Sequence, residues 1–361
     1  MHIPSDPRPP GHAGPATAPA APQAVPTSPA NPADPSLAPA AASAATPAAS
    51  GLSATLAGAA RALGQALAAG EPGRLAARAL LEAELLRQPR FGLDLLAESR
   101  GGADVGALLA DDAPAVSRHD CSALDSPVAI AAATLALVPR ARRHGVAATF
   151  LTGIAGFGRF APFVRHLADA GLAGMAGTEG GPLVAPAGGR RGVLSTNPLA
   201  FALGQGDDRV VIDVATSAIT LAAAKAARQQ GTSLPEGVAL DADGRPTRDA
   251  ALMAALLPRG GRVGSLLGLI VELLAGVIGG GRAAEDRGAT ARRGVFLLAF
   301  DPSQAGDAEW PRRLARLRHD WQDAGGHWPT GRPLADDAVL PTEVLARLDA
   351  LLSRLTATPA P

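Results

Sequence analysis

The spacing of apolar side chains predicts helices at both ends of the chain and between its strands. Leucine and alanine recur every three to four positions over residues 52–67, and the pattern resumes over residues 75–85 after Glu71-Pro72-Gly73. We therefore expect two amphipathic helices that are separated at this proline. The same periodicity predicts further helices at residues 127–143, 218–230, 263–279, 310–324 and 341–355.

Short apolar runs predict strands between these helices. They cover residues 146–151, 192–202, 209–214 and 294–300. The alternation predicts an α+β, α/β-like fold. The apolar run 263–278 is shorter than the roughly 20 residues that a bilayer requires and contains Glu272, so it predicts a buried core helix and no membrane partner.

The first 50 residues differ in composition from the rest of the chain. They hold thirteen of the 32 prolines, with much alanine and serine, and such a segment buries too little apolar surface to offset the entropy of ordering. Disorder is predicted, in a flexible linker or in a leader for a needle-type (type III-like) bacterial secretion system. Ile3 favours a leader and Asp6 counts against it. We expect a cytoplasmic protein or, with a leader, one secreted into a host cell.

Charge and cysteine content exclude several classes of function. The 33 basic and 33 acidic side chains give a formal net charge of +0, which provides no uniform field for nucleic acid. Cys121 is the one cysteine, so a disulfide within the chain and a thiolate zinc site are both excluded. We therefore expect no metal and no nucleic-acid partner, and a reducing compartment fits this cysteine content.

A glycine-rich loop follows the predicted strand at residues 146–151. Its sequence is Gly153-Ile-Ala-Gly156-Phe-Gly158, and glycines at such a place let backbone N–H groups approach a phosphate. The spacing is GxxGxG rather than GxGxxG. A tight turn that needs positive φ angles explains the same glycines.

Several motifs stand in a fixed order after this loop. They are Leu194-Ser195-Thr196-Asn197-Pro198, Val211-Ile212-Asp213-Val214-Ala215-Thr216-Ser217, Leu234-Pro235-Glu236-Gly237 with Gly244-Arg245-Pro246-Thr247, Leu257-Pro258-Arg259-Gly260-Gly261, and Leu273-Leu274-Ala275-Gly276. The series resembles the second type of malate/L-lactate dehydrogenases, from about residue 55 to 350. That family includes ureidoglycolate, sulfolactate and diketogulonate oxidoreductases and the reductase of piperideine-2-carboxylate.

The resemblance implies a non-Rossmann malate/lactate dehydrogenase fold and a homodimer with the active site near the subunit interface. It also implies hydride transfer between NAD or NADP and a 2-oxo acid or cyclic imine. The implied cofactor-binding residues are Phe157, Gly158, Thr196, Asn197, Asp213, Val214 and Ala215. Structural roles are available to the same residues: Asn197-Pro198 as a turn, Asp213 as a strand-end cap, and Thr216 with Ser217 as an N-cap pair.

Three positions depart from the family's motifs. The segment Pro89-Arg90-Phe91-Gly92 replaces Ser-His-Gly, whose imidazole donates a proton, and we place Arg90 at this position. Gly156 replaces the histidine of His-Phe-Gly, and Gly260-Gly261-Arg262-Val263-Gly264 lacks the lysine of Gly-Gly-x-Lys-Gly. Arg90 stays protonated, so it can bind a substrate carboxylate but not donate a proton. Arg262 is one residue away from the lysine position.

We expect structural or solvated roles for the other histidines that we considered, at positions 119, 144, 166, 319 and 327. Two hypotheses follow. The protein is a divergent NAD(P)H-dependent reductase with impaired or altered catalysis, or it is a pseudoenzyme that serves as a secreted effector or binding protein. The expected parts are a leader or linker at 1–50, helices at 51–118, a cofactor-binding α/β part at 119–308, and C-terminal helices at 309–361 that pack on the N-terminal part.

Overall fold

The computed structural model describes residues 53–99, 101, 104–110, 112–281 and 293–357. They fall within one compact unit, Ala40–Pro361. The segment predicted to be disordered, residues 1–50, lies outside the described residues.

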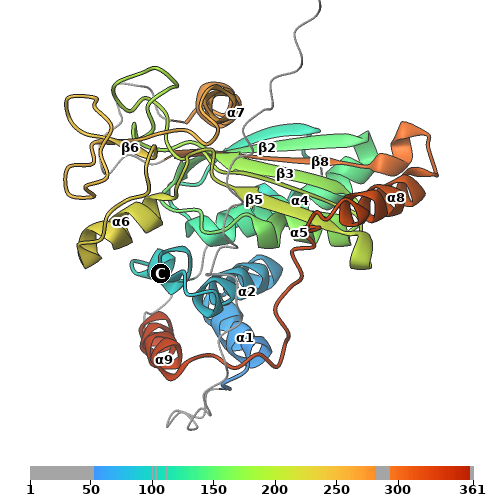
Figure 1. The fold of residues 1–361 in the computed structure, drawn as a ribbon. Coiled ribbons are helices and arrows are strands. Elements are labelled where there is room, and N and C mark those ends of the chain that lie inside the picture. Colours follow the sequence, from blue (N-terminus) through green and yellow to red (C-terminus); the bar gives the residue numbers. More distant parts are fainter. Residues whose placement is uncertain (1–52, 100, 102–103, 111, 282–292, 358–361) are drawn as a thin grey trace, which may run out of the picture. The chain divides into compact units, whose positions relative to one another are not determined.

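A six-stranded mixed sheet forms the centre of the described fold (Figure 1). Its strands are β1 (Val116–Asp120), β2 (Val146–Ile154), β3 (Ala173–Thr178), β4 (Leu199–Leu203), β5 (Val210–Val214) and β8 (Arg293–Phe300). The spatial order is β1-β2-β8-β3-β4-β5, with β1 parallel to β2 and the other pairs antiparallel. The strand that comes last in the chain is thus inserted at the middle of the sheet.

Helices lie on both faces of the sheet. On one face are α4 (Ser126–His144) and α5 (Ala161–Asp169), which contact β2, β8, β3 and β4. On the other face, α7 (Arg262–Glu272) continues into the π-helical segment η5 (Leu273–Ile278), which packs on β8 and β3. The predicted mixed α and β architecture is confirmed.

Two N-terminal helices, α1 (Leu56–Ala66) and α2 (Gly70–Leu85), pack against each other. The predicted break at Glu71-Pro72-Gly73 is wrong, because these residues form the first turn of α2. Proline is tolerated there since the first turn's N–H groups have no partner within the helix. The chain instead turns at residues 67–69, where Ala68 has a φ of 52°.

The remaining elements connect these layers or lie at the periphery. They are α3 (Gly106–Leu109), α6 (Leu221–Gln230), α8 (Trp310–Asp323), α9 (Thr342–Ala357), β6 (Ala239–Leu240), β7 (Ala255–Leu256) and the 3₁₀ turns η2 (Pro89–Phe91), η3 (Leu93–Leu96), η4 (Gly206–Asp208) and η7 (Pro302–Ala305). Of the predicted strand 192–202, only Leu199–Leu203 is a strand, because Pro198 ends the pattern before it.

The prediction of a buried core helix at residues 263–278 is wrong. One side of α7 and η5 is buried through small or short residues, including Gly264, Gly268 and Ala275. The opposite side exposes an apolar row to solvent. Its members are Val263, Leu266, Leu267, Leu269, Ile270, Leu273, Val277 and Ile278. No described helix is long and apolar enough to cross a membrane.

Two buried glutamates on α2 join it to distant elements. Glu82 accepts hydrogen bonds from Nη2 of Arg165 on α5, at 2.8 and 2.9 Å. Glu84 accepts from the Leu93 amide at 2.7 Å and from Arg347 of α9 at 2.9 Å. Buried charges of this kind remain favourable only while they are paired. These bonds therefore fix α2 against α5, α9 and the segment that contains η2 and η3.

We expect Glu82→Gln to lower the free energy of unfolding by about 3–5 kcal/mol, because it removes the counter-charge of a buried guanidinium. Urea denaturation of the full chain measures this loss. The matched control is Glu309→Gln, which breaks an exposed pair with Arg312 and should cost less than about 1 kcal/mol. Equal losses in the two variants would contradict the role assigned to Glu82.

Candidate functional site

The glycine-rich segment Gly153–Gly158 begins at the end of β2 and makes close contacts with neighbouring parts of the chain. Gly153 has a φ of 76°, and a Cβ there would lie 2.6 Å from the Ser122 amide nitrogen. Gly158 has a φ of 70°, and a Cβ would lie 3.2 Å from the carbonyl oxygen of Phe91. Positive φ angles are thus present at two of the three glycines, of which Gly153 lies within β2 at a register shift and Gly158 in the loop that follows. These glycines allow close backbone contacts within the protein.

Apolar side chains from the η2–η3 segment pack against this loop. The rings of Phe91 and Phe157 have centroids 6.4 Å apart, and Phe157 stacks on Phe160 at 5.4 Å with an interplanar angle of 9°. A Cβ at Gly156 would lie only 2.5 Å from Cδ2 of Leu95. Three aromatic rings and one leucine therefore form a continuous apolar wall, which we call the aromatic wall: Phe91, Leu95, Phe157 and Phe160.

Arg90 is exposed on η2. In Ser-His-Gly the histidine directly precedes the glycine, and the residue that directly precedes Gly92 is Phe91. Counted in this register, the place of the imidazole is taken by Phe91, one residue after the predicted Arg90. A role for Arg90 in binding substrate stays a prediction.

Asp213, on β5, is tied to the end of the loop. Its Oδ2 accepts a hydrogen bond from the Ala161 amide at 2.9 Å, so it caps the start of α5. Burial raises the pKa of Asp213, and hydrogen bonds from Ala161 and Phe160 and the charge of Arg159 partly oppose this rise. Val214 and Ala215 follow at the end of the strand. The structure thus brings Asp213 and the Phe157–Gly158 loop together.

The Thr196-Asn197 turn forms a second group of predicted residues. The amide and Oγ1 of Thr216 both donate to the Thr196 carbonyl, at 3.0 and 3.1 Å. Asn197 is fully buried with a φ of 30°, and its Nδ2 donates to the Gly268 carbonyl at 2.8 Å and to Glu272 at 3.0 Å. Within the described part of the chain its Oδ1 has no hydrogen-bond partner.

The predicted N-cap pair is wrong. Thr220 caps α6 by accepting from the Ala223 amide at 3.1 Å. Thr216 holds the Thr196-Asn197 turn, and the hydroxyl of Ser217 donates to the Ile219 carbonyl. The helix begins at Leu221, later than predicted, because Thr220 is the last residue with extended backbone before it.

Arg293 lies close to the Phe157 loop and was missed by the sequence reasoning. It begins β8 and is paired in register with Ile154, the last residue of β2. Its guanidinium carbon lies 5.6 Å from the centroid of the Phe157 ring. A Cβ at Gly180 would lie 3.9 Å from Nη1 of Arg293 and 2.4 Å from Oγ of Ser195. No motif marks this arginine, because the sequence does not reveal that β8 is inserted beside β2.

Arg262 and Val263 begin α7 and are both exposed to solvent. The structure joins Arg262 to neither group of site residues, so its role toward a cofactor stays a prediction. A Cβ at Gly264 would lie 2.1 Å from the carbonyl oxygen of Arg259. This glycine is therefore required for the tight approach of the preceding loop to the helix.

The structure places four of the histidines considered above as follows. His144 is the last residue of α4, and His319 lies 3.4 Å from Asp323 on the surface of α8. Burial lowers the pKa of His166, and burial together with Arg140 lowers the pKa of His119. Cys121 is buried, which raises the pKa of its thiol to about 12. Among the described residues, no three His, Cys, Asp or Glu side chains gather as a metal site.

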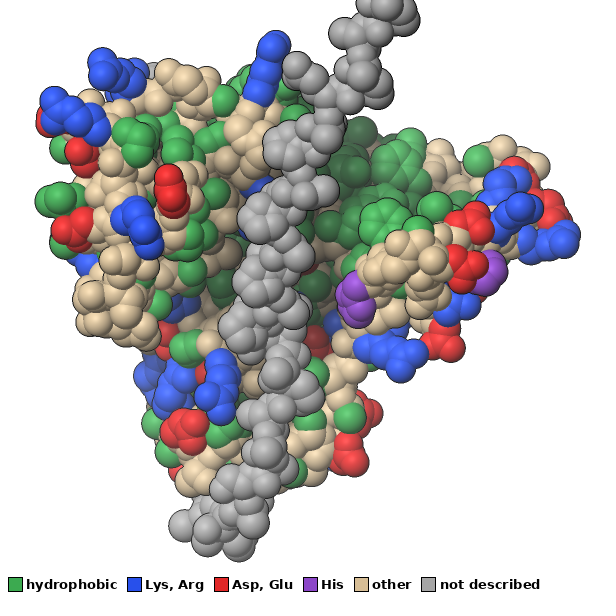
Figure 2. Space-filling view, in the orientation of Figure 1, with side chains coloured by type: hydrophobic (Ala, Val, Ile, Leu, Met, Phe, Trp, Pro, Cys, Tyr) green, Lys and Arg blue, Asp and Glu red, His purple; other side chains and the backbone are tan. Residues whose placement is uncertain are grey.

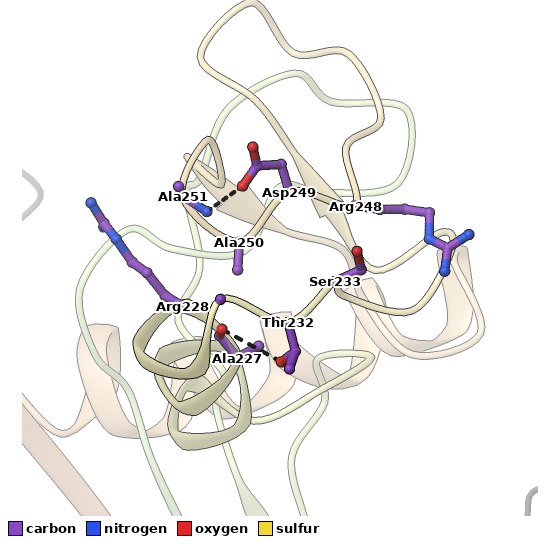
Figure 3. Close-up of a pocket in the computed structure, with 9 residues that line it drawn as sticks. Ala227, Arg228, Thr232, Ser233, Arg248, Asp249, Ala250 and Ala251 are labelled. Atoms are coloured by element: carbon purple, nitrogen blue, oxygen red, sulfur yellow. Dashed lines mark hydrogen bonds between the residues drawn. The ribbon is translucent and has the colours of Figure 1, made fainter.

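A surface pocket lies at the C-terminal end of α6 (Figure 3). Its volume is about 340 Å³, and none of the predicted site residues line it. The lining residues are Ala227, Arg228, Gly231, Thr232, Ser233, Arg248, Asp249, Ala250 and Ala251. In the close-up, Arg228 and Arg248 extend from opposite sides of the pocket. The site residues implied by the motifs therefore lie outside this pocket.

The residues present fit a nicotinamide cofactor in one definite respect. The orphaned Oδ1 of Asn197 is a buried acceptor, and a buried acceptor without a donor is costly. A carboxamide N–H group of a nicotinamide is a donor of the required kind. The carboxylate of Asp213 already accepts from the start of α5, so it is less available for a ligand.

Comparison with known proteins identifies the family of this chain. Residues 59–325 match the family described as Malate/L-lactate dehydrogenase. The chain is similar to a Delta(1)-pyrroline-2-carboxylate reductase of Pseudomonas fluorescens, with 44% identity over 176 residues, which are 46% of this chain and 52% of the relative. It is also similar to a (2R)-3-sulfolactate dehydrogenase (NADP(+)) of Chromohalobacter salexigens, with 37% identity over 248 residues, 64% of this chain and 74% of the relative. The first match spans about half the length of its relative.

A solved structure shows the same fold. The crystal structure of delta1-piperideine-2-carboxylate reductase from Pseudomonas syringae pvar. tomato superposes with a TM-score of 0.65 at 26% identity, covering 83% of this chain and 98% of that chain. The predicted resemblance is confirmed, and the chain belongs to the malate/L-lactate dehydrogenase family.

Proposed function

We propose that this protein reduces cyclic imines that carry a 2-carboxylate, using NADH or NADPH, and that it reduces 2-oxo acids poorly. The observation that supports this proposal is the aromatic wall. Phe91 directly precedes Gly92, where the family has an imidazole, and its ring faces Phe157 at 6.4 Å. The similarity to proteins named as pyrroline- and piperideine-2-carboxylate reductases supports the same substrate class.

The chemistry of the two substrate classes explains the preference. Reduction of a 2-oxo acid turns a carbonyl oxygen into an alkoxide, which needs a proton from a positioned acid. A protonated cyclic imine already carries its proton on nitrogen. Hydride addition to its C2 forms one C–H bond, converts the C=N bond into a single bond and leaves a neutral amine. A site without an imidazole therefore loses less of its reduction rate with a protonated imine than with a 2-oxo acid.

The residues that would hold the nicotinamide cofactor are those of the loop and the turn. Phe157 and Gly158 would contact it from the end of β2, and Thr196 and Asn197 from the turn before β4. The orphaned Oδ1 of Asn197 would accept from its carboxamide. The bound nicotinamide supplies the hydride, and the apolar side chains of the aromatic wall exclude water from the reacting carbon.

The second part of the proposal is a homodimer formed through the face of the sheet that carries α7. A row across all six strands on this face is apolar: Val116, Ala148, Leu298, Met175, Phe201 and Ile212, aligned by the strand register. Val146 and Phe300 form part of the next row and are 43% and 40% exposed. Figure 2 shows hydrophobic side chains gathered over this part of the sheet.

The exposed row of α7 and η5 extends the same surface. Ile270 is 49% exposed and Val277 is 69% exposed, although the helix side toward the sheet is well packed. Monomeric soluble proteins rarely expose apolar patches of this extent. A second copy of the chain offers the same surface, and a two-fold interface would cover both apolar faces at once.

The first test is turnover by the full chain. With NADPH, we expect Δ1-pyrroline-2-carboxylate and Δ1-piperideine-2-carboxylate to be reduced, and pyruvate and oxaloacetate to react at least about 100-fold more slowly in kcat/KM, because a missing general acid costs roughly 10²–10⁴. NADPH absorbance measures the rates. Phe91→His should raise the 2-oxo acid rate by roughly tenfold or more.

Two outcomes would contradict this proposal. Equal rates with imines and 2-oxo acids would show that a proton donor is present. Absence of imine reduction, with NADPH binding still measured by calorimetry, would favour the pseudoenzyme. The matched control is Leu252→His, at an exposed position, which should change neither rate.

The second test concerns the dimer. We expect sedimentation of the full chain at micromolar concentration to give twice the mass of one chain, and Ile270→Asp to shift it toward monomer, because a charge would be buried without a partner. The matched control is Leu252→Asp, whose position is 60% exposed and outside this surface. A wild-type chain that sediments as a monomer would overturn the proposal.

A further inference from the structure

The site described above contains one cation that neither the motifs nor the proposed function has assigned. Arg293 begins β8, opposite Ile154. This pairing places its backbone directly beside the start of the loop that carries Phe157. Because β8 is inserted between β2 and β3, the arginine lies near both halves of the site although it is 136 residues after Phe157 and 97 after Thr196 in sequence.

Two measurements locate the guanidinium. Its central carbon is 5.6 Å from the Phe157 ring centroid, within the range of a cation–π contact. Its Nη1 lies 3.9 Å from where a Cβ of Gly180 would stand, and the same Cβ position is 2.4 Å from Oγ of Ser195. The guanidinium is therefore close both to the aromatic wall and to Gly180, which neighbours the residue that precedes Thr196.

The chemistry of the substrate defines what such a group can do. Both substrate classes considered for this family carry a carboxylate directly on the carbon that would receive the hydride. A planar guanidinium binds a carboxylate through two parallel N–H···O bonds, which fixes the orientation of the attached carbon.

Arg90 is the competing candidate for this role. It is exposed on η2, and the neighbouring side chain that turns toward the loop is Phe91. Arg293 is half-buried and directly faces Phe157. Charge-assisted hydrogen bonds are stronger where solvent is partly excluded. The position of Arg293 is therefore the better one for holding an anion at a fixed orientation.

We propose that Arg293 binds the substrate's carboxylate and thereby fixes the orientation of a cyclic imine beside the aromatic wall. This inference rests on the proposed function for its substrate class. It assigns to β8 a specificity-determining residue, which selects cyclic imines with a free 2-carboxylate over their amides or esters. Arg293 itself transfers no proton, because its guanidinium remains charged at working pH.

The test is calorimetric binding to the full chain, using pyrrole-2-carboxylate as a planar, non-reducible probe and pyrrole-2-carboxamide as its uncharged counterpart. We expect Arg293→Gln to weaken carboxylate binding by about 10- to 100-fold, because hydrogen bonds between two charged groups are lost. Carboxamide binding should not change. Arg293→Lys should restore part of the loss, since it retains charge but not the bidentate geometry.

The matched control is Arg312→Gln, an exposed arginine on α8, which should leave both affinities unchanged. Unchanged carboxamide binding by Arg293→Gln also shows that this variant is folded. The inference is overturned if Arg293→Gln binds pyrrole-2-carboxylate as the wild type does, if Arg90→Gln alone causes the loss, or if the wild-type chain binds neither probe.

Turnover separates this inference from the proposed function. If the wild type binds pyrrole-2-carboxylate through Arg293 but reduces no imine, the proposed function fails and the carboxylate site stands. If the wild type reduces imines and Arg293→Gln has the same KM, the inference fails and the proposed function stands. A raised KM in Arg293→Gln, with kcat changed much less, supports both.

Discussion

The buried carboxylate of Glu84 is the interaction on which the candidate site depends. It accepts from the Leu93 amide and from Arg347, and a Cβ at Gly92 would lie 2.4 Å from its Oε1. A buried carboxylate requires such donors, so the chain between α2 and α3 is held close to α2. Phe91 and Leu95 lie on either side of this anchor, and they reach the loop after β2 for that reason. The aromatic wall is thus positioned by a charge outside it.

The composition of the site changes the chemistry that it can perform. Phe91, Leu95, Phe157 and Phe160 contribute no titratable group, and the nearby carboxylate of Asp213 accepts from the start of α5. Few charged groups therefore act in a largely apolar environment, where each electrostatic contact is stronger than in water. Such a site favours binding and orienting a charged substrate over moving protons, which agrees with a substrate that arrives protonated.

The sequence predicts much of this fold, and the failures have physical reasons. The long periodic helices at residues 126–144 and 310–323 form nearly as expected, because their apolar faces and caps are local features. The strand β3, with the sequence Ala-Gly-Met-Ala-Gly-Thr, carries little strand propensity, and only its place in the sheet makes it a strand. Arg293 was missed for a related reason, since strand order is not encoded locally. Arg90 and Phe91 differ by one position, and it is the Phe91 ring that lies near the loop.

The two positions that we assign to the family's imidazoles, Phe91 and Gly156, are structurally coupled, which limits how an imidazole can be introduced there. A side chain at Gly156 would meet Cδ2 of Leu95 at 2.5 Å, so any residue larger than glycine requires Leu95 to move. Leu95 follows Gly92 in the segment held by Glu84, and its other methyl group lies 3.3 Å from a Cβ position at Gly158. A side chain at position 156 therefore disturbs the packing of Leu95 in the η2–η3 segment. Replacement of Phe91 by histidine leaves these contacts in place, whereas replacement of Gly156 does not. The packing consequently permits one imidazole to return without rearrangement but not both.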